Sequence, residues 1–321
     1  MFVSVIIPCY NCEKKIAECI NSLLLQKTKH KYEIITVNDG STDKTEKIMK
    51  EINSNKVKYF SQKNSGPAKA RNFGAKKAGG EIILFIDSDC VAEKNWLEEM
   101  INPFETKNVA AVQGAYITKQ KEIIARFSQI EIEERYEKMK KADEIDWVGS
   151  YSAGYKKNIF DELGGFDESF PIASGEDPEL SYKVAEKGYK IIFNPKAIVY
   201  HTHPASLKKY LRTKFFRAYY RPKLYSKHKT KIIKDSYTPQ SLKAQIVIFY
   251  LIVLSLIIGF YINIVFLFAI CLFVLHIILG ANLFVLAYKK DIEVALASPI
   301  ILFLRSIVFG AGLIWGKVNG W

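Results

Sequence analysis

The chain has 321 residues, enough for one large α/β domain and a further segment. Its formal net charge of +13 is unevenly distributed, because residues 205–321 carry 16 Lys and Arg against 3 Asp and Glu, and residues 1–204 are neutral overall. A nucleic-acid-binding protein carries such an excess on its folded domain, whereas a basic block beside apolar runs favours an anionic membrane surface. The charge pattern therefore argues against a nucleic-acid partner.

The first two hundred residues alternate predicted strands and helices. Apolar runs predict strands at 3–8, 32–38, 57–61, 81–87 and 110–118, and helical patterns occupy 14–25, 41–53, 67–78, 122–141 and 177–187. This alternation predicts an α/β domain over residues 1–204 with a doubly wound, mostly parallel sheet. Ligands of such sheets bind beyond the carboxyl ends of the strands, so polar residues at those ends are the candidates for a functional site.

The remaining residues predict an α-helical membrane region. Residues 205–243 form a basic amphipathic juxtamembrane segment, and residues 244–287 contain no charged side chain. This stretch is long enough for two spans, at about 244–261 and 264–287. A third apolar helix, at about 292–316, carries Arg305 near its centre, and we expect it to pack on the other two or to lie at the interface.

The same charges predict a topology. Basic segments stay on the cytoplasmic side, so residues 205–243 place the preceding domain in the cytoplasm of a multi-pass membrane protein. The chain also begins directly with a predicted strand, which agrees with a cytosolic N-terminal domain. We expect Arg305 to reach lipid headgroups or the phosphate of a lipid-linked acceptor, and we expect membrane lipids to be partners.

The first motif follows the second predicted strand, at residues 37–43 (Val-Asn-Asp-Gly-Ser-Thr-Asp). Asp39 comes directly after the strand, and Gly40 and Ser41 suit a tight turn that leads into a helix. A carboxylate at this place can accept hydrogen bonds from a nucleotide base or ribose. An ordinary strand-to-helix turn has the same composition.

The second motif is Asp87-Ser-Asp89, at the end of the most apolar strand. Two carboxylates at a strand end can share a hard divalent cation, and Mg²⁺ or Mn²⁺ prefers such oxygen ligands together with substrate phosphates. A polar loop would also begin in this way, so this motif is weak by itself.

The third motif is Gly175-Glu-Asp177, at the start of a predicted helix. Asp177 precedes a proline, which is typical of a first helical turn, so helix capping alone explains an acid there. A general base at this position needs other groups nearby, which the sequence does not reveal.

Taken together, these motifs resemble family 2 glycosyltransferases of the GT-A fold. The matching segments occur in the family's order at residues 5–11, 37–43, 64–72, 87–89, 164–168, 175–177 and at His201. They cover about two hundred residues. One departure is Cys90, which stands where the family often has a further acid beside the metal motif.

The resemblance implies a role for each matching residue. The nucleotide sugar would contact Pro8, Tyr10, Asn11, Asp39, Arg71, Asp87 and Ser88. Asp89 and His201 would hold Mn²⁺ or Mg²⁺, Asp167 and Glu176 would face the acceptor, and Asp177 would be the catalytic base.

The function implied is inverting transfer of a sugar from a UDP- or GDP-linked donor to a hydroxyl of a glycan or lipid-linked acceptor. Two alternatives stay open. One is a polyprenyl-phosphate sugar synthase, whose anionic acceptor needs no general base. The other is a non-catalytic membrane protein that uses a glycosyltransferase-like domain for binding. A processive polysaccharide synthase is disfavoured because the chain has no Gln-x-x-Arg-Trp motif after Asp177.

Overall fold

The computed structural model describes residues 1–233 and 235–320. The chain divides into two compact units, Met1–Lys119 with Met139–Thr202, and Gln120–Lys138 with His203–Trp321. The segment 1–204, predicted as one domain, therefore includes a stretch, Gln120–Lys138, that the structure groups with the C-terminal unit.

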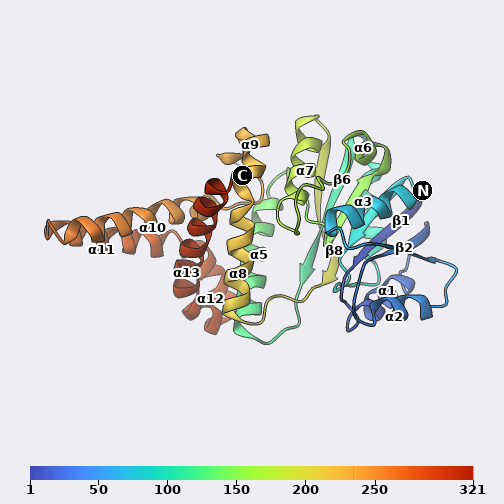
Figure 1. Cartoon of the computed structure of the whole chain (residues 1–321), viewed down its shortest axis with the longest axis horizontal. Helices are drawn as coiled ribbons and strands as arrows, with labels where there is room; N and C mark the ends of the chain where they lie inside the picture. The colour runs from blue at the N-terminus through green and yellow to red at the C-terminus, as the bar shows by residue number, and fades with distance from the viewer. Residues whose placement is uncertain (234, 321) are drawn as a thin grey trace. The chain divides into compact units, whose positions relative to one another are not determined.

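The first unit is built on one eight-stranded sheet with the order β3-β2-β1-β4-β7-β6-β8-β5. Figure 1 labels β1, β2, β6 and β8 of this sheet. The strands are β1 (Phe2–Cys9), β2 (Lys31–Asp39), β3 (Val57–Gln62), β4 (Ile82–Ile86), β5 (Val91–Ala92), β6 (Val109–Ile117), β7 (Ser152–Lys156) and β8 (Lys190–Tyr200). The helices of this unit are α1 (Ile16–Leu24), α2 (Thr45–Glu51), α3 (Pro67–Lys77), α4 (Trp96–Ile101), η1 (Asn102–Glu105), α6 (Lys157–Glu162) and α7 (Glu176–Glu186).

The sheet is mixed, with parallel pairs dominating its first half. β3, β2, β1 and β4 run parallel, β7 lies antiparallel between β4 and β6, and β6 pairs in parallel with β8. All five residues of β4 are buried, which explains its continuous apolar sequence. The α/β fold with a mostly parallel sheet is thus confirmed.

The carboxyl ends of β2, β1 and β4 lie side by side because these three strands are adjacent and parallel. Asp39 ends β2, and Asp87 directly follows β4. After Asp39 the backbone turns through Gly40, whose φ is +70°, and a Cβ there would lie 2.7 Å from the backbone nitrogen of Asn64. A side chain at position 40 would be strained by the positive φ and would collide with the backbone of Asn64, so this turn requires glycine.

The second unit is helical. Its helices are α5 (Ile123–Met139), α8 (Leu207–Tyr219), α9 (Arg221–Lys227), η2 (Lys229–Ile232), α10 (Gln240–Gly259), α11 (Ile264–Ile278), α12 (Ala281–Lys290) and α13 (Ile292–Val318). α10 and α13 are each long and apolar enough to cross a membrane, and α11 with α12 forms a third candidate span that bends by 46°. The predicted continuous helix at 264–287 is therefore broken near Gly280.

The basic segment that precedes α10 is amphipathic where it forms α8. Lys208, Lys209 and Arg212 are exposed, whereas Tyr210 and Lys214 are buried. α8 also packs closely on α13, because a Cβ at Gly312 would lie 2.5 Å from the carbonyl oxygen of Phe215. Small residues on α13 thus allow two helix backbones to approach each other.

A buried ionic cluster holds the second unit together around Glu131 of α5. One carboxylate oxygen of Glu131 accepts hydrogen bonds from Arg135 (3.0 Å) and Arg305 (2.9 Å), and the other accepts from Lys214 (2.6 Å) and Tyr210 (3.2 Å). All five side chains are buried. Burial alone would raise the pKa of Glu131, but the three cations hold that pKa well below its ordinary value.

The predicted role of Arg305 at lipid headgroups is wrong. Only 4% of Arg305 is exposed, and its guanidinium is occupied by Glu131 and by the side-chain oxygen of Gln245, at 2.8 Å. A charge within an apolar helix is costly unless it is paired, and here the partner comes from α5, far earlier in the chain.

Candidate active site

A cavity of about 450 Å³ lies at the carboxyl ends of β1 and β4. Its lining includes Tyr10, Asn11, Ser88 and Asp89, four of the residues predicted at the site. Two lysines at positions 14 and 15 also line it, together with the carboxylates of Glu13 and Asp43, so the lining is rich in charges of both signs. Pro8 lies within β1, half-buried, two residues before the exposed ring of Tyr10. A cavity of this size and polarity suits a nucleotide better than an apolar ligand.

Asn11 fixes the wall of this cavity. It has a positive φ of 48°, its backbone N–H donates to Oγ of Ser41, and its side-chain oxygen accepts from the backbone N–H of Thr42 at 2.8 Å. Asparagine tolerates this backbone conformation better than most residues. The side chain therefore ties the loop after β1 to the turn after β2.

Asp39 is buried, and most of its hydrogen-bonding capacity is used within the protein. It accepts from Nε2 of Gln62 (2.7 Å) and from the backbone N–H groups of Ser65 (2.9 Å) and Gly66 (2.9 Å). An ionised carboxylate has about four acceptor positions, so these three bonds leave roughly one for a ligand. Asp39 thus shapes the loop that leads into α3.

The side chains of Asp89, Cys90 and His201 form a possible metal site, with their ligand atoms within 4.8 Å of one another. The two-residue strand β5 pairs antiparallel with β8, which brings the end of β8 to the loop after β4. Nε2 of His201 lies 3.7 Å from Oδ1 of Asp89, and its ring stacks on Tyr116 with centroids 5.0 Å apart.

The donor set fits Mn²⁺ or Mg²⁺ through two of these residues. Burial raises the pKa of the Cys90 thiol well above its ordinary value, and a hard cation has little affinity for sulfur, so Cys90 is the weakest candidate ligand of the three. The carboxylate and the imidazole are suitable ligands for a hard or borderline cation, which would keep positions for phosphate oxygens and water.

Arg71 of α3 joins two parts of the site. Its Nη2 donates to Asp87 and its Nη1 to Glu176, both at 3.0 Å, and only 3% of the arginine is exposed. Glu176 is fully buried, and its other oxygen accepts from the backbone N–H groups of Ser174 and Gly175. Glu176 therefore orients Arg71 and the start of α7, and in this structure it presents no atom to solvent.

Asp177 lies in the first turn of α7, beside this ion pair. Its Oδ2 accepts from the backbone N–H of Ser150 at 3.0 Å and from the Ser150 hydroxyl at 3.2 Å. Oδ1 is buried and receives no hydrogen bond from the described residues. Burial raises the pKa of Asp177 to about 7, the Glu176 carboxylate adds to the rise, and the Arg71 guanidinium opposes it.

Two residues that orient this site escaped the sequence reasoning. Ser150 has no recognisable motif, and only the fold brings it to Asp177. Asn72 lies within a matching segment, but the sequence assigned it no role. Its side-chain amide donates a hydrogen bond to the carbonyl oxygen of Phe166 (2.8 Å) and accepts one from the N–H of Phe166 (2.9 Å). Asp167, the next residue, caps its own turn by accepting from Ser169.

Comparison with protein families gives a match to glycosyl transferase family 2 over residues 4–164. That range is half of the chain. It includes the residues predicted to bind the nucleotide sugar, Asp39, Arg71 and Asp87 among them, and the predicted metal ligand Asp89. It ends before Asp167, Asp177 and His201.

Individual relatives agree with this match. The chain is 28% identical over 233 residues to the glycosyltransferase GlyA of Streptococcus pneumoniae. The aligned region covers 67% of this chain and 33% of that protein. It is 28% identical over 214 residues to the glycosyltransferase AglE of Haloferax volcanii, covering 64% of this chain and 67% of the relative. The chain thus spans only about a third of the first relative's length.

Among solved structures, the chain is similar to the mannosyltransferase PcManGT from Pyrobaculum calidifontis, in complex with GDP-Man and Mn²⁺. The TM-score is 0.60 at 21% identity, over 99% of this chain and 86% of that chain. At this identity the similarity concerns the fold, and it confirms the GT-A-like architecture.

Proposed function

The chain belongs to glycosyl transferase family 2, and on that basis we propose that it is an inverting, metal-dependent enzyme acting at a membrane. It would move a sugar from a UDP- or GDP-linked donor to a hydroxyl of a glycan or lipid-linked acceptor. The observation that carries this proposal is the bridge made by Arg71, which links Asp87 at the end of β4 to Glu176 beside Asp177. This bridge supports a single site that holds the residues for the sugar donor and the proposed base together.

The donor nucleotide would occupy the cavity next to β1. Tyr10 is 52% exposed and offers a ring face for the base, while Lys14 and Lys15 offer charge to the diphosphate. The remaining acceptor position of Asp39 can take a base or ribose donor. Asp87, held by Arg71, would lie near the ribose.

Asp89 and His201 would hold the divalent metal ion beside the diphosphate. The ion would supply Lewis-acid stabilisation of the leaving nucleoside diphosphate. His201 is kept in place by its stacking on Tyr116 and by its backbone N–H, which donates to the carbonyl oxygen of Ile117 at 2.9 Å.

Asp177 would remove the proton from the acceptor hydroxyl as that oxygen attacks the anomeric carbon. A base is most useful when its pKa lies near the working pH, and the raised pKa of about 7 meets that condition. Ser150 leaves Oδ1 as the atom to receive the proton. Because Oδ1 is shielded from solvent, acceptor binding must displace a neighbouring group. One displacement with no covalent intermediate inverts the anomeric centre.

The membrane location is supported by the candidate spans and by the exposed cations of α8. Basic side chains beside a span favour contact with anionic headgroups on the cytoplasmic side. We therefore place the catalytic unit in the cytoplasm, where nucleotide sugars would be its donors.

A panel of UDP- and GDP-sugars tests the proposal. Detergent-solubilised protein is incubated with each donor, Mn²⁺ and membrane extract, and the released nucleoside diphosphate is measured. We expect release from at least one donor, and its loss in the Asp89→Ala variant. Release that is equal in both proteins would contradict the proposed site.

A further inference from the structure

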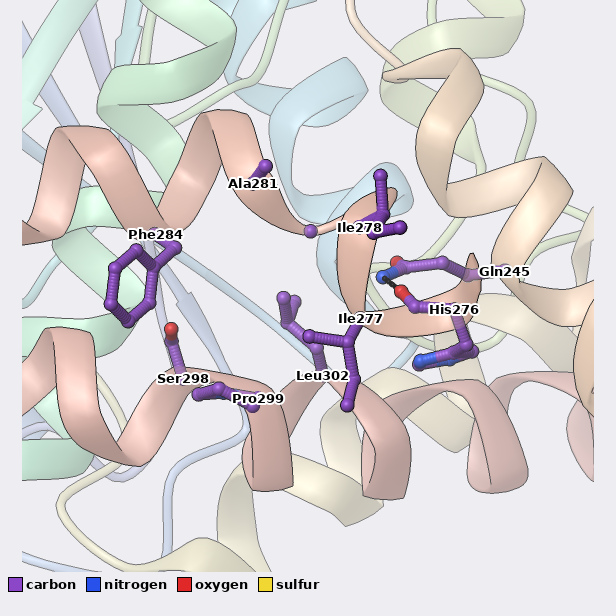
Figure 2. A pocket seen from close by; sticks show the side chains of 10 residues that line it. Gln245, His276, Ile277, Ile278, Ala281, Phe284, Ser298, Pro299 and Leu302 are labelled. Atoms are coloured by element: carbon purple, nitrogen blue, oxygen red, sulfur yellow. Dashed lines mark hydrogen bonds between the residues drawn. The ribbon is translucent and has the colours of Figure 1, made fainter. Parts of the chain in front are cut away.

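The second unit contains a cavity of about 300 Å³ among its apolar helices. Figure 2 shows Ala281 and Phe284 from α12 on one side and Ser298, Pro299 and Leu302 from α13 on the other. Gln245 of α10 and His276 of α11 close one end. Carbon atoms form almost all of the remaining wall.

Two breaks in helical regularity create this cavity. α11 and α12 bend at Gly280, where a Cβ would lie 2.7 Å from the end of the Leu302 side chain, so this bend packs closely against α13. Within α13, Pro299 cannot donate to the carbonyl oxygen of Ala295. The hydroxyl of Ser298 donates to that oxygen instead, at 2.8 Å. The recess therefore forms without leaving that carbonyl unpaired.

The polar side chains in the lining are already engaged. The Gln245 amide donates to the carbonyl oxygen of His276 at 3.1 Å and accepts from Arg305 at 2.8 Å. Nε2 of His276 lies 3.0 Å from the hydroxyl of Ser306. A ligand that relies on hydrogen bonds or charge would find these partners occupied, whereas a hydrocarbon needs none of them.

We propose that this cavity binds an acyl chain of a membrane phospholipid. The volume is roughly twice that of an apolar protein cavity of about 150 Å³ that binds benzene, so it holds a chain segment of roughly a dozen carbons. Ile278 and Ala281 at the rim are exposed, which gives a chain a lateral entry. The helices that form the cavity are candidate membrane spans, and phospholipid chains would be the most abundant hydrocarbon around them.

Photo-crosslinking tests this assignment without any sugar-transfer assay. The full chain is reconstituted in vesicles of equal parts phosphatidylcholine and phosphatidylglycerol, with a trace of phosphatidylcholine that carries a diazirine on one acyl chain. We expect the crosslinks per residue to be strongest on Phe284 and Leu302, which line the cavity, and weaker on the exposed face of α10, which bulk lipid would contact. Crosslinks spread evenly over all exposed apolar residues would overturn the proposal.

A pair of variants on α12 sharpens the test. Ala281→Phe fills the mouth of the cavity and should abolish crosslinking there, whereas Val285→Phe adds the same ring at an exposed position outside the lining. Both variants should keep the melting temperature of the wild type. Unchanged crosslinking in Ala281→Phe refutes the site. Complete displacement of the probe by a trace of polyprenyl phosphate would also refute it, since the occupant would then be an isoprenoid chain.

Discussion

Nε2 of His201 lies 3.7 Å from Oδ1 of Asp89, although more than a hundred residues separate them in the sequence. The pairing of β5 with β8 brings them together, with Val91 opposite Tyr200. This short pairing places an imidazole beside the carboxylate at the end of β4. If the pair holds a metal ion, activity must respond to the loss of either side chain.

We predict that His201→Ala raises the Mn²⁺ concentration needed for half-maximal activity by at least roughly 10- to 100-fold, because that range applies to the loss of an outer-shell partner and His201 would be a direct ligand. Excess EDTA should stop the wild-type enzyme. His30→Ala, a histidine near Glu98 outside the site, is the matched control and should behave like the wild type. Full turnover in EDTA would disprove the metal role.

The environment of Asp177 predicts the pH dependence of the reaction. Its pKa is raised to about 7, first by burial and then by the Glu176 carboxylate. A general base acts when deprotonated, so kcat should rise as the pH increases through about 7 and level off above it. Glu176→Gln removes the neighbouring negative charge, which should lower the pKa of Asp177 and move the rise in kcat to lower pH.

Glu186→Gln is the control for that profile, because Glu186 is an exposed residue at the far end of the same helix. Its pH profile should match that of the wild type. If kcat of the Glu176→Gln variant rises at the same pH as that of the wild type, Glu176 does not set the pKa of the base.

Much of the fold and of the donor side of the site follows from local sequence. Asp39 and Asp87 come directly at the ends of apolar runs, and parallel strands place such ends at one edge of the sheet. The periodicity of each segment was therefore enough to predict the α/β fold and to select these carboxylates.

The rest depends on contacts between distant segments. Nothing local indicates that residues 120–138 join the C-terminal unit, or that Glu131 there neutralises Arg305. Likewise, nothing local indicates that Glu176 is buried in an ion pair with Arg71, a partner on another helix. The bend near Gly280 and its close approach to Leu302 of α13 are contacts that periodicity does not encode.

The Glu131 cluster predicts a large stability effect. Glu131→Ala leaves Arg135, Lys214 and Arg305 buried without their shared carboxylate, and breaking a buried pair in this way costs about 3–5 kcal/mol. Glu133→Ala, on the same helix, removes a more exposed ion pair with Lys290 and should cost less than about 1 kcal/mol. Denaturant unfolding in detergent measures both. Equal losses would show that the cluster is not a stabilising centre.

Membrane topology can be tested by single cysteines in a background without the five native ones. Lys227→Cys lies in the basic segment and Ile262→Cys in the uncharged turn between α10 and α11, and both positions are exposed. In intact cells an impermeant maleimide should label position 262 and leave position 227 protected, because the basic segment stays in the cytoplasm. The reverse pattern would refute the proposed orientation and the cytosolic supply of donor.

The most direct test of the central proposal measures two quantities for the Asp177→Asn variant, the kcat of sugar transfer and the Kd for the nucleotide sugar. The amide keeps the shape of the side chain and an oxygen for the Ser150 bonds, but it cannot accept a proton as a base. We predict that kcat falls by roughly 10²–10⁴-fold, the usual contribution of a positioned general base, while the Kd for the nucleotide sugar stays unchanged. A variant that transfers sugar at the wild-type rate would show that Asp177 is not the base.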